Sequence, residues 1–363
     1  MGRLGWEARI EDHGLDAVQA VVHRVFNWLP RVEAYTGIGT PTQVRVLCRT
    51  LLSPAEHSRE TPSPSERGWR AFICLPADGE AVRVEIGDYN FTATTDRGGY
   101  IDKTVQLPTP LKPGWHSLNI TALRSGATSR GSVRIVDPDA RYGIVSDIDD
   151  TAMITSVPIF VVAAWNTFIE KTSDRKPVAG MAQFFTEIIN DYPDTPIIYL
   201  SNGAWNAAHS LRRFLRRWHF PAGPLLLTDF GPTDTGAFRS GKAHKRKQLK
   251  WLMDTFPQLS WILVGDDGQS DPVIYSEAAS EHPGRVAAVG IRTLSPVERI
   301  VRLAGTDAAP AGEQFGSDVP VIEAHDGITM LNEFRETGVL PEWLQEKCKV
   351  CGGTKCGHKR GRH

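Results

Sequence analysis

The stretch Tyr142-Gly-Ile-Val-Ser-Asp147-Ile-Asp149-Asp150-Thr151 joins a short apolar run to a cluster of carboxylates. The apolar part is typical of a buried strand of a parallel sheet. Because strand side chains alternate, Asp147 and Asp149 are expected to face the same side. Close carboxylates repel each other, and a hard cation relieves that repulsion. Asp147 is therefore a candidate nucleophile toward phosphorus, and Asp149 a candidate general acid and base.

Downstream of this stretch, apolar strands alternate with helical segments. The sequence predicts strands at 197–200, 225–227, 261–264 and 286–291, and helices at 205–218, 245–256 and 272–282. Such alternation predicts an α/β domain, residues 139–305, with a parallel sheet covered by helices. Ligands bind such sheets at the carboxyl ends of the strands.

The later strands are also followed by polar residues, just as the first strand is followed by its aspartates. Ser201 and Asn202 end the second strand, Lys245 opens a helix, and Asp266 and Asp271 follow the fourth strand. Taken singly, each is more often a helix cap, a turn or a solvated charge. Together they converge on one rim of the predicted sheet. A hydroxyl for phosphate, a fixed cation and a third carboxylate for a metal would then share one site.

These residues resemble the motif order of the haloacid dehalogenase (HAD) superfamily, which is Asp-x-Asp-x-Thr, Ser or Thr, Lys, and Gly-Asp-x(3–4)-Asp. More narrowly, the texts SDIDDT, KPVAGMAQFF, IIYLSNGAWN, HKRKQLKWLMDTFP and ILVGDDGQSDPVIY resemble the catalytic domain of the actin-patch-protein type of phosphatidate phosphatase. The resemblance covers roughly residues 141–295. It implies a HAD-like Rossmannoid sheet with a small cap, a Mg²⁺ cofactor and phosphatase activity.

The resemblance also implies roles for the charged residues. Asp147 would be nucleophile and metal ligand, and Asp266 would complete the metal site. Asp149 would be the acid and base and would also offer the metal its backbone carbonyl. Lys245 would neutralise charge, and Asp271 would orient Lys245 or a metal-bound water. Lys242 and Lys247 lie close in the sequence and stay open as alternatives to Lys245.

Three further residues are assigned to phosphate binding by the same resemblance. Ser201 and Asn202 would contact the phosphate, and Thr151 would support the first loop. The family commonly reads Ser-x-Ser-Pro-Trp-Asn after the second strand, whereas this chain reads Ser-Asn-Gly-Ala-Trp-Asn at residues 201–206. The absent Pro and second Ser leave the rigidity of this loop unexplained. Asp267 replaces a common Ser and adds a carboxylate near the expected metal.

The sequence before residue 139 has a different pattern. Residues 1–35 show apolar positions at helical spacing and predict an N-terminal helical segment. Residues 36–138 contain short alternating runs separated by Gly, Pro and Asp, which predict a β-sandwich-like domain.

Residues 306–363 predict a linker, a short helix at 327–337 and a basic tail. The tail holds four sulfur or imidazole groups, at Cys348, Cys351, Cys356 and His358. Cys-x-x-Cys is a common half-site for structural Zn²⁺, so zinc is one interpretation and an unstructured basic tail is the other. The odd cysteine count and the absence of a signal-like N-terminus favour a cytoplasmic location.

Net charge is -1, so overall charge gives no reason to expect a nucleic-acid partner. The uncharged run 152–169 is interrupted by polar residues and Pro, and a transmembrane segment is not expected. Two features suit a lipid substrate at an anionic membrane surface: an apolar flap at 157–165, and basic clusters in 212–217 and 239–250. Core packing and solvated helix faces are the ordinary alternatives.

Three functions remain open. The first is a phosphatase of lipids, peripheral to the inner face of the membrane. The second is a phosphatase of soluble metabolites or phosphoproteins. The third is a non-catalytic membrane-binding module, which the full set of catalytic residue types disfavours.

Overall fold

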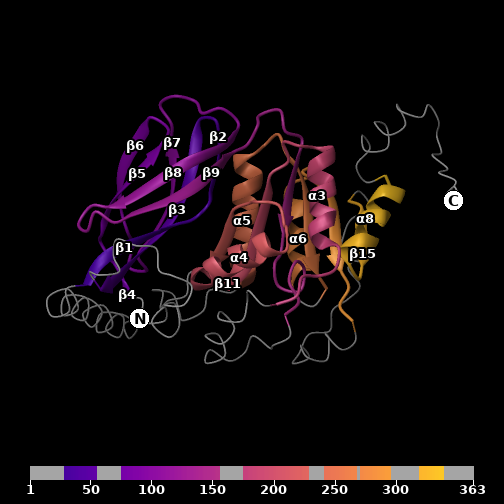
Figure 1. Ribbon diagram of the computed structural model, residues 1–363. Helices are drawn as coiled ribbons and strands as arrows, with labels where there is room; N and C mark the ends of the chain where they lie inside the picture. Colours follow the sequence, from indigo (N-terminus) through magenta and orange to yellow (C-terminus); the bar gives the residue numbers. More distant parts are fainter. Residues whose placement is uncertain are drawn as a thin grey trace, which may run out of the picture.

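The computed structural model describes residues 28–54, 75–155, 175–228, 241–267, 270–295 and 319–338. These residues form two parts that lie side by side (Figure 1). A β-rich part, indigo to purple, precedes a parallel sheet flanked by helices. In the described residues, no helix combines the length and the apolar character needed to cross a bilayer.

The β-rich part is one sheet of nine strands in the order β1-β3-β2-β9-β8-β5-β6, with β4 and β7 paired to β3. The bounds are β1 Trp28–Ala34, β2 Gly37–Thr40, β3 Gln43–Pro54, β4 Leu75–Pro76, β5 Ala81–Ile86, β6 Tyr89–Thr94, β7 Tyr100–Gln106, β8 Gly114–Ala122 and β9 Thr128–Ile135. The pairings are antiparallel except that of β2 with β9. Alternating apolar residues of β3, β5, β8 and β9 share one core. The expected β-rich domain is thus present, with its strands hydrogen-bonded into one sheet, and it is called the sandwich below after that expectation.

Strand β3 contributes to two cores. Val44, Val46 and Cys48 are buried in the core of the sandwich. The intervening Leu47 belongs to the core cluster of the parallel-sheet domain. Since successive strand side chains point to opposite faces, β3 lies at the wall between the two parts.

The second part is a six-stranded sheet in the order β12-β11-β10-β13-β14-β15, with every pair parallel. The strands are β10 Tyr142–Ser146, β11 Ile197–Ala204, β12 Leu225–Thr228, β13 Ser260–Asp266, β14 Val286–Arg292 and β15 Val321–Ala324. The chain starts at the centre, runs outward through β11 and β12, and returns to continue at β13. The order therefore reverses at β10, and ligands bind such sheets at the carboxyl ends beside the reversal.

Helices cover both faces of this sheet. They are α3 Met181–Asp191, α4 Ala208–Arg217, α5 Gly241–Thr255, α6 Asp271–Glu281 and α8 Gly327–Glu336, with one 3₁₀ turn η4 at Trp205–Ala207. Helix α3 packs on α8, where Phe184 contacts Phe334 at 5.1 Å between ring centroids. Helices α5 and α6 pack against each other and are joined by the Arg246–Glu277 ion pair. The fold expected from the sequence, a parallel α/β domain after a β-rich one, is confirmed.

Two predicted boundaries are wrong. The helical prediction for 1–35 fails from Trp28 onward, because Trp28–Ala34 pairs with Cys48–Pro54 as strand β1. Here burial alternates with period two and Pro30 disfavours a helix interior. The parallel-sheet domain also continues past residue 305, since β15 pairs with β14 and α8 packs on α3. Residues 1–27 and 306–318, and nearly all of the expected cap and flap, lie outside the described residues.

Candidate active site

Asp147 stands directly after β10, at the reversal of strand order. Its backbone N–H donates to the carbonyl of Val264 on β13, at 2.8 Å, which fixes the loop to the neighbouring strand. Asp150 then takes a left-handed conformation with φ +56°, and its N–H donates to the carbonyl of Met153. Asp tolerates this conformation better than most residues. The chain consequently folds back over the strand end, and Asp147 is only 2% exposed.

Lys245 of α5 bridges two of the predicted carboxylates. Its ammonium Nζ donates to Asp147 Oδ1 at 2.8 Å and to Asp271 Oδ1 at 2.5 Å. All three side chains are nearly inaccessible to solvent. Gly265 makes this approach possible, because a Cβ there would lie 2.5 Å from Asp271 Oδ2. The two lysines that the sequence left as alternatives, Lys242 and Lys247, are exposed.

The electrostatics of this cluster show an excess of negative charge. Burial raises the pKa of the Asp147 carboxyl well above its usual value, and the nearby Asp271, Asp266 and Asp149 raise it further against the opposing effect of Lys245. Burial alone would lower the pKa of Lys245, but Asp147 and Asp271 outweigh it and hold the ammonium charged. One cation thus serves several carboxylates, and a further positive charge would stabilise the group.

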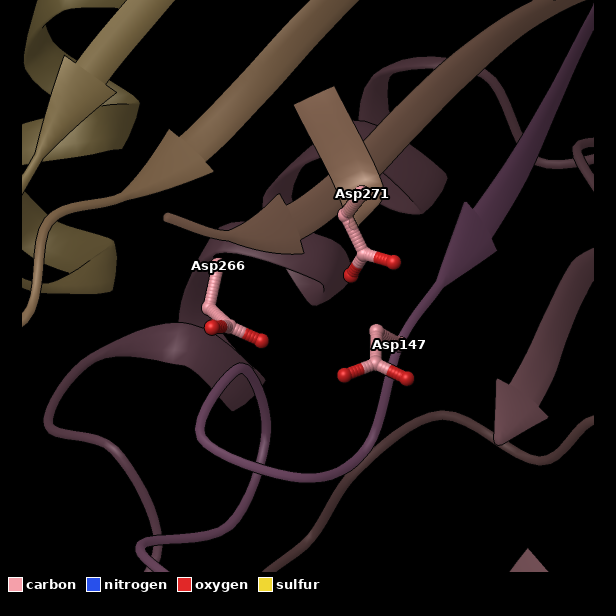
Figure 2. A group of neighbouring side chains, drawn as sticks. All are labelled: Asp147, Asp266 and Asp271. Carbon is pink, nitrogen blue, oxygen red and sulfur yellow. The ribbon is translucent and has the colours of Figure 1, made fainter. Parts of the chain in front are cut away.

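Three carboxylates are arranged to hold a metal ion. Figure 2 shows Asp147, Asp266 and Asp271 converging from the ends of β10 and β13 and the start of α6. One oxygen from each lies within 4.8 Å of the others, and all three residues are buried. The Oδ2 atoms of Asp147 and Asp271 are buried and have no hydrogen-bond partner among the described residues. Hard, unsatisfied oxygens of this kind are the ligands that Mg²⁺ prefers.

Asp149 points to a different neighbour. Its Oδ2 accepts from the hydroxyl of Ser201, and its Oδ1 accepts from that of Thr155, both at 3.1 Å. Asp149 is half-buried, unlike Asp147. Asp149, the expected acid and base, thus lies beside Ser201, the expected phosphate ligand. It is not part of the three-carboxylate cluster of Asp147, Asp266 and Asp271.

The other predicted phosphate residues flank these groups. Thr151 is fully buried, and its hydroxyl has no hydrogen-bond partner among the described residues. Asn202 is exposed at the start of the loop after Ser201, and its carbonyl accepts from Thr228 Oγ1 at 3.0 Å. Its side chain lies against Gly241, the first residue of α5, where a Cβ would come within 2.5 Å.

Sequence reasoning missed two residues of this neighbourhood. Arg292 at the end of β14 donates from Nη1 to the carbonyl of Asp150 at 2.9 Å, which supports the folded-back loop. Thr155 holds both acidic residues of the loop, since its N–H donates to Asp150 Oδ1 at 2.7 Å. No sequence signal identifies either one, because an Arg at a strand end and a Thr in a loop are ordinary.

Asp267, the added carboxylate, has a structural contact. Its Oδ1 accepts from the N–H of Leu294 at 3.0 Å, which ties the loop after β13 to the segment after β14. The residues proposed for zinc, Cys348, Cys351, Cys356 and His358, lie outside the described residues.

The basic clusters are partly neutralised. Within α5, Lys245 is buried, Arg246 pairs with Glu277 of α6, and Lys250 pairs with Asp254. In α4, Arg212 donates to the carbonyl of Ala34 in the sandwich. Three basic residues of the 239–250 cluster are therefore buried or paired with acidic side chains. On α4, Arg213, Arg216 and Arg217 are exposed.

Comparison with known proteins agrees with the resemblance seen in the sequence. Residues 142–293 match the family described as phosphatidate phosphatase APP1, catalytic domain. This segment is therefore similar to that catalytic domain. The match ends one residue after β14 and includes every predicted site residue outside the tail.

Two curated relatives match over part of their length. Phosphatidate phosphatase APP1 of Saccharomyces cerevisiae is 27% identical over 155 residues, which are 42% of this chain and 26% of the yeast protein. An uncharacterized protein of Schizosaccharomyces pombe is 24% identical over 211 residues, 56% of this chain and 34% of its own. The chain therefore spans about a quarter to a third of the length of these relatives.

Among solved structures, the HAD domain of effector protein Lem4 from Legionella pneumophila matches with 14% identity and a TM-score of 0.31. It covers 44% of this chain and 89% of that domain. At that score, the fold assignment depends on the order and direction of the six strands.

Proposed function

We propose that this chain is a Mg²⁺-dependent phosphomonoester hydrolase that forms an aspartyl-phosphate on Asp147. One observation carries the proposal. Asp147 lies at the reversal of strand order, with one oxygen held by Lys245 and the other buried without a hydrogen-bond partner among the described residues. A carboxylate that only stabilised the fold would be expected to have both oxygens satisfied.

The buried oxygens of Asp147, Asp266 and Asp271 fit a divalent cation and would hold it. When bound, Mg²⁺ supplies positive charge that keeps Asp147 ionised and offsets the charge of the phosphate. Lys245 holds Asp147 in a fixed position against Asp271. That pre-organisation lowers the cost of orienting the nucleophile.

In the proposed reaction, an Asp147 oxygen attacks phosphorus and the ester P–O bond breaks. Asp149, in its protonated form, gives its proton to the departing alcohol oxygen. Asp149 then takes a proton from water, whose oxygen attacks phosphorus and breaks the bond to Asp147. Inorganic phosphate leaves, and both aspartates return to their starting states. The hydroxyl of Ser201 donates to Asp149 at 3.1 Å, which supports a role for this hydroxyl in binding the phosphate beside Asp149.

We further propose phosphatidate as the substrate, giving diacylglycerol and phosphate at the cytoplasmic face of an anionic membrane. The family match over residues 142–293 and the name of the yeast relative support this choice. The exposed arginines of α4 support a peripheral contact, since each positive charge close to an anionic bilayer contributes about 1 kcal/mol.

One assay tests the activity and the substrate together. Phosphate release is measured from phosphatidate in mixed micelles and from p-nitrophenyl phosphate, with Mg²⁺ and with EDTA. We expect release from phosphatidate that needs Mg²⁺ and is lost in Asp147→Asn. Release confined to the soluble ester would favour a phosphatase of soluble metabolites or phosphoproteins and reject the lipid substrate. Activity retained in Asp147→Asn would reject the mechanism.

A further inference from the structure

The segment 201–207, called the loop after Ser201, comprises the end of β11 and the 3₁₀ turn η4. It lacks the Pro and the second Ser that are common in the family which the sequence resembles, and its first half is held from within its own domain. The N–H of Gly203 donates to Ser201 Oγ at 2.9 Å. The hydroxyl of Thr228 on β12 donates to the carbonyls of Asn202 and Gly203, at 3.0 and 3.2 Å. These contacts fix the first half of the loop, residues 201–203. Ala204 is paired with Thr228 of β12, whereas the second half, the 3₁₀ turn at residues 205–207, is contacted from the other domain.

The sandwich supplies an aromatic support to the second half. Tyr35, in the turn between β1 and β2, stacks on Trp205 with ring centroids 4.3 Å apart and an interplanar angle of 19°. Both rings are buried, at 3% and 7% exposed. The guanidinium of Arg212 lies 5.2 Å from the Tyr35 ring centroid and also donates to Ala34. Trp205 therefore sits between its own domain and a ring of the other one.

A hydrogen bond from the sandwich reaches the next residue. Arg49 Nη1 on β3 donates to the side-chain oxygen of Asn206. The guanidinium is itself fixed by the sandwich, because Nε donates to the carbonyl of Gly98 at 3.2 Å and the group lies 4.6 Å from the Tyr100 ring centroid. Arg49 is 7% exposed, whereas Asn206 is exposed. A buried, pre-oriented donor thus holds an exposed loop residue.

From this geometry we infer that the sandwich positions the phosphate-binding loop, with Arg49 acting through Asn206 and Tyr35 acting through Trp205. The inference rests on the proposed function, because it assigns the loop at Ser201 to phosphate. It gives the sandwich a defined part in the reaction. Arg49 and Tyr35 are positioning residues, since neither touches the three-carboxylate cluster. They replace, from another domain, the stiffness that Pro would give within the loop.

The interface offers a matched control. Arg45 lies on the same face of β3, four residues before Arg49, and also joins the two domains. Its Nη1 donates to Gln248 of α5 at 2.8 Å, and its guanidinium lies 4.4 Å from the Trp251 ring centroid. Arg45→Met therefore weakens docking of the domains through α5, without removing a contact to residues 201–207.

The test compares Arg49→Met, Asn206→Ala, their double variant and Arg45→Met in the full chain. Inorganic phosphate binding in the presence of Mg²⁺ is measured by calorimetry, so that the readout needs no turnover. We expect each single variant at 49 or 206 to weaken phosphate binding about tenfold, the scale of one hydrogen bond to a charged group. The double variant should be no weaker than either single one, because both remove the same contact. Arg45→Met should retain wild-type phosphate affinity.

Amide hydrogen exchange gives a direct second readout. Exchange at residues 203–207 should accelerate in Arg49→Met and Asn206→Ala, and stay unchanged in Arg45→Met. Should Arg49→Met fail to fold, Asn206→Ala still decides, because its side chain is exposed.

The outcomes separate this inference from the proposed function. Wild-type phosphate affinity and exchange in Asn206→Ala would overturn the inference while leaving the phosphatase intact. Equal losses of affinity in Arg45→Met and Arg49→Met would also overturn it, since general docking would then explain the effect. A wild-type chain that neither releases nor binds phosphate would overturn both.

Discussion

Two buried cations, Lys245 in the phosphatase domain and Arg45 at the domain wall, illustrate opposite uses of charge. Arg45 is matched by its surroundings: Nε and Nη2 each donate to one oxygen of Asp102 at 2.6 Å, and Nη1 donates to Gln248. Lys245 meets Asp147 and Asp271 with Asp266 close by, and two carboxylate oxygens have no hydrogen bond in the described part of the chain. A balanced cluster joins domains, and an unbalanced one is suited to bind a cation.

The contrast between the two clusters is tested most strongly by removing Lys245, the cation of the cluster with excess negative charge. Lys245→Met leaves buried carboxylates without their counter-charge, and we expect a loss of roughly 3–5 kcal/mol in the free energy of unfolding. Phosphate release should fall about a thousandfold or more, because the nucleophile loses its orienting contact. Chemical denaturation and steady-state assays measure the two effects.

Lys247→Met serves as the matched control, since Lys247 is exposed two residues away on the same helix. It should stay within about 0.5 kcal/mol of wild type. A Lys245→Met protein as stable as wild type would show that the carboxylates are not buried together with a charged lysine.

Removing the carboxylate of Asp266 tests metal binding through its effect on thermal stability. Mg²⁺ at about one hundred times its dissociation constant stabilises the folded state by about 2.7 kcal/mol, and thus raises Tm by several degrees. In Asp266→Asn we expect this Mg²⁺-dependent rise in Tm to disappear. Thermal unfolding with Mg²⁺ and with EDTA measures it.

Asp102→Asn at the domain wall should keep the full rise in Tm with Mg²⁺. An Asp266→Asn protein whose Tm still responds to Mg²⁺ as wild type does would place the metal elsewhere.

His244 precedes Lys245 on α5 and is affected by the charges of both Lys245 and Arg45. Burial lowers the pKa of its imidazole to about 4; the hydrogen bond with the carbonyl of Leu226 opposes this shift, and the charges of Arg45, Lys245 and Lys247 add to it. The ordinary value is 6.5, so between about pH 6.5 and 4 the unfolded chain binds a proton that the folded chain excludes. Stability due to neutral His244 is therefore present above pH 6.5 and lost as the pH falls toward 4.

We expect this group to contribute on the order of 1–3 kcal/mol of acid-dependent destabilisation. The free energy of unfolding, measured between pH 7 and 4.5, should fall less steeply in His244→Gln than in wild type. Parallel curves would mean that His244 is accessible and titrates normally.

The balanced cluster should give the smallest effect. In a double-mutant cycle of Arg45→Met and Asp102→Ala, we expect a coupling free energy of about 1 kcal/mol. The Asp102 side chain is 47% exposed, so solvent weakens the ion pair. Denaturant unfolding of the four proteins measures it. A coupling free energy above about 3 kcal/mol would mean that the Arg45–Asp102 pair contributes as much to stability as the Lys245 cluster, and would contradict the contrast.

The sequence was sufficient for features that depend on local pattern. Apolar strands followed by Asp147, Ser201 and Asp266 predicted both the parallel sheet and the rim where these residues meet, because parallel strands end on one side. The choice of Lys245 over Lys247 needed the structure, since helix periodicity alone does not say which side faces the sheet. Strand β1 was missed because residues before Trp28 have helical spacing that runs into it.

Contacts between distant segments could not be predicted. Nothing in the sequence near Arg49 indicates a partner 157 residues later at Asn206. Strand β15 was missed for a similar reason: four residues carry little periodicity, and their assignment comes from pairing with β14.

The alternation of β3 between two cores has a consequence for how such proteins diversify. Val46 and Cys48 serve one domain, while Leu47 and Arg49 serve the other. Inserting or deleting one residue in β3 would exchange the two sets, turning apolar groups outward and an arginine into the sandwich core. The two domains are thus expected to be inherited as a pair. Recombination that transplanted the phosphatase domain alone would uncover Trp205 and leave its loop without support.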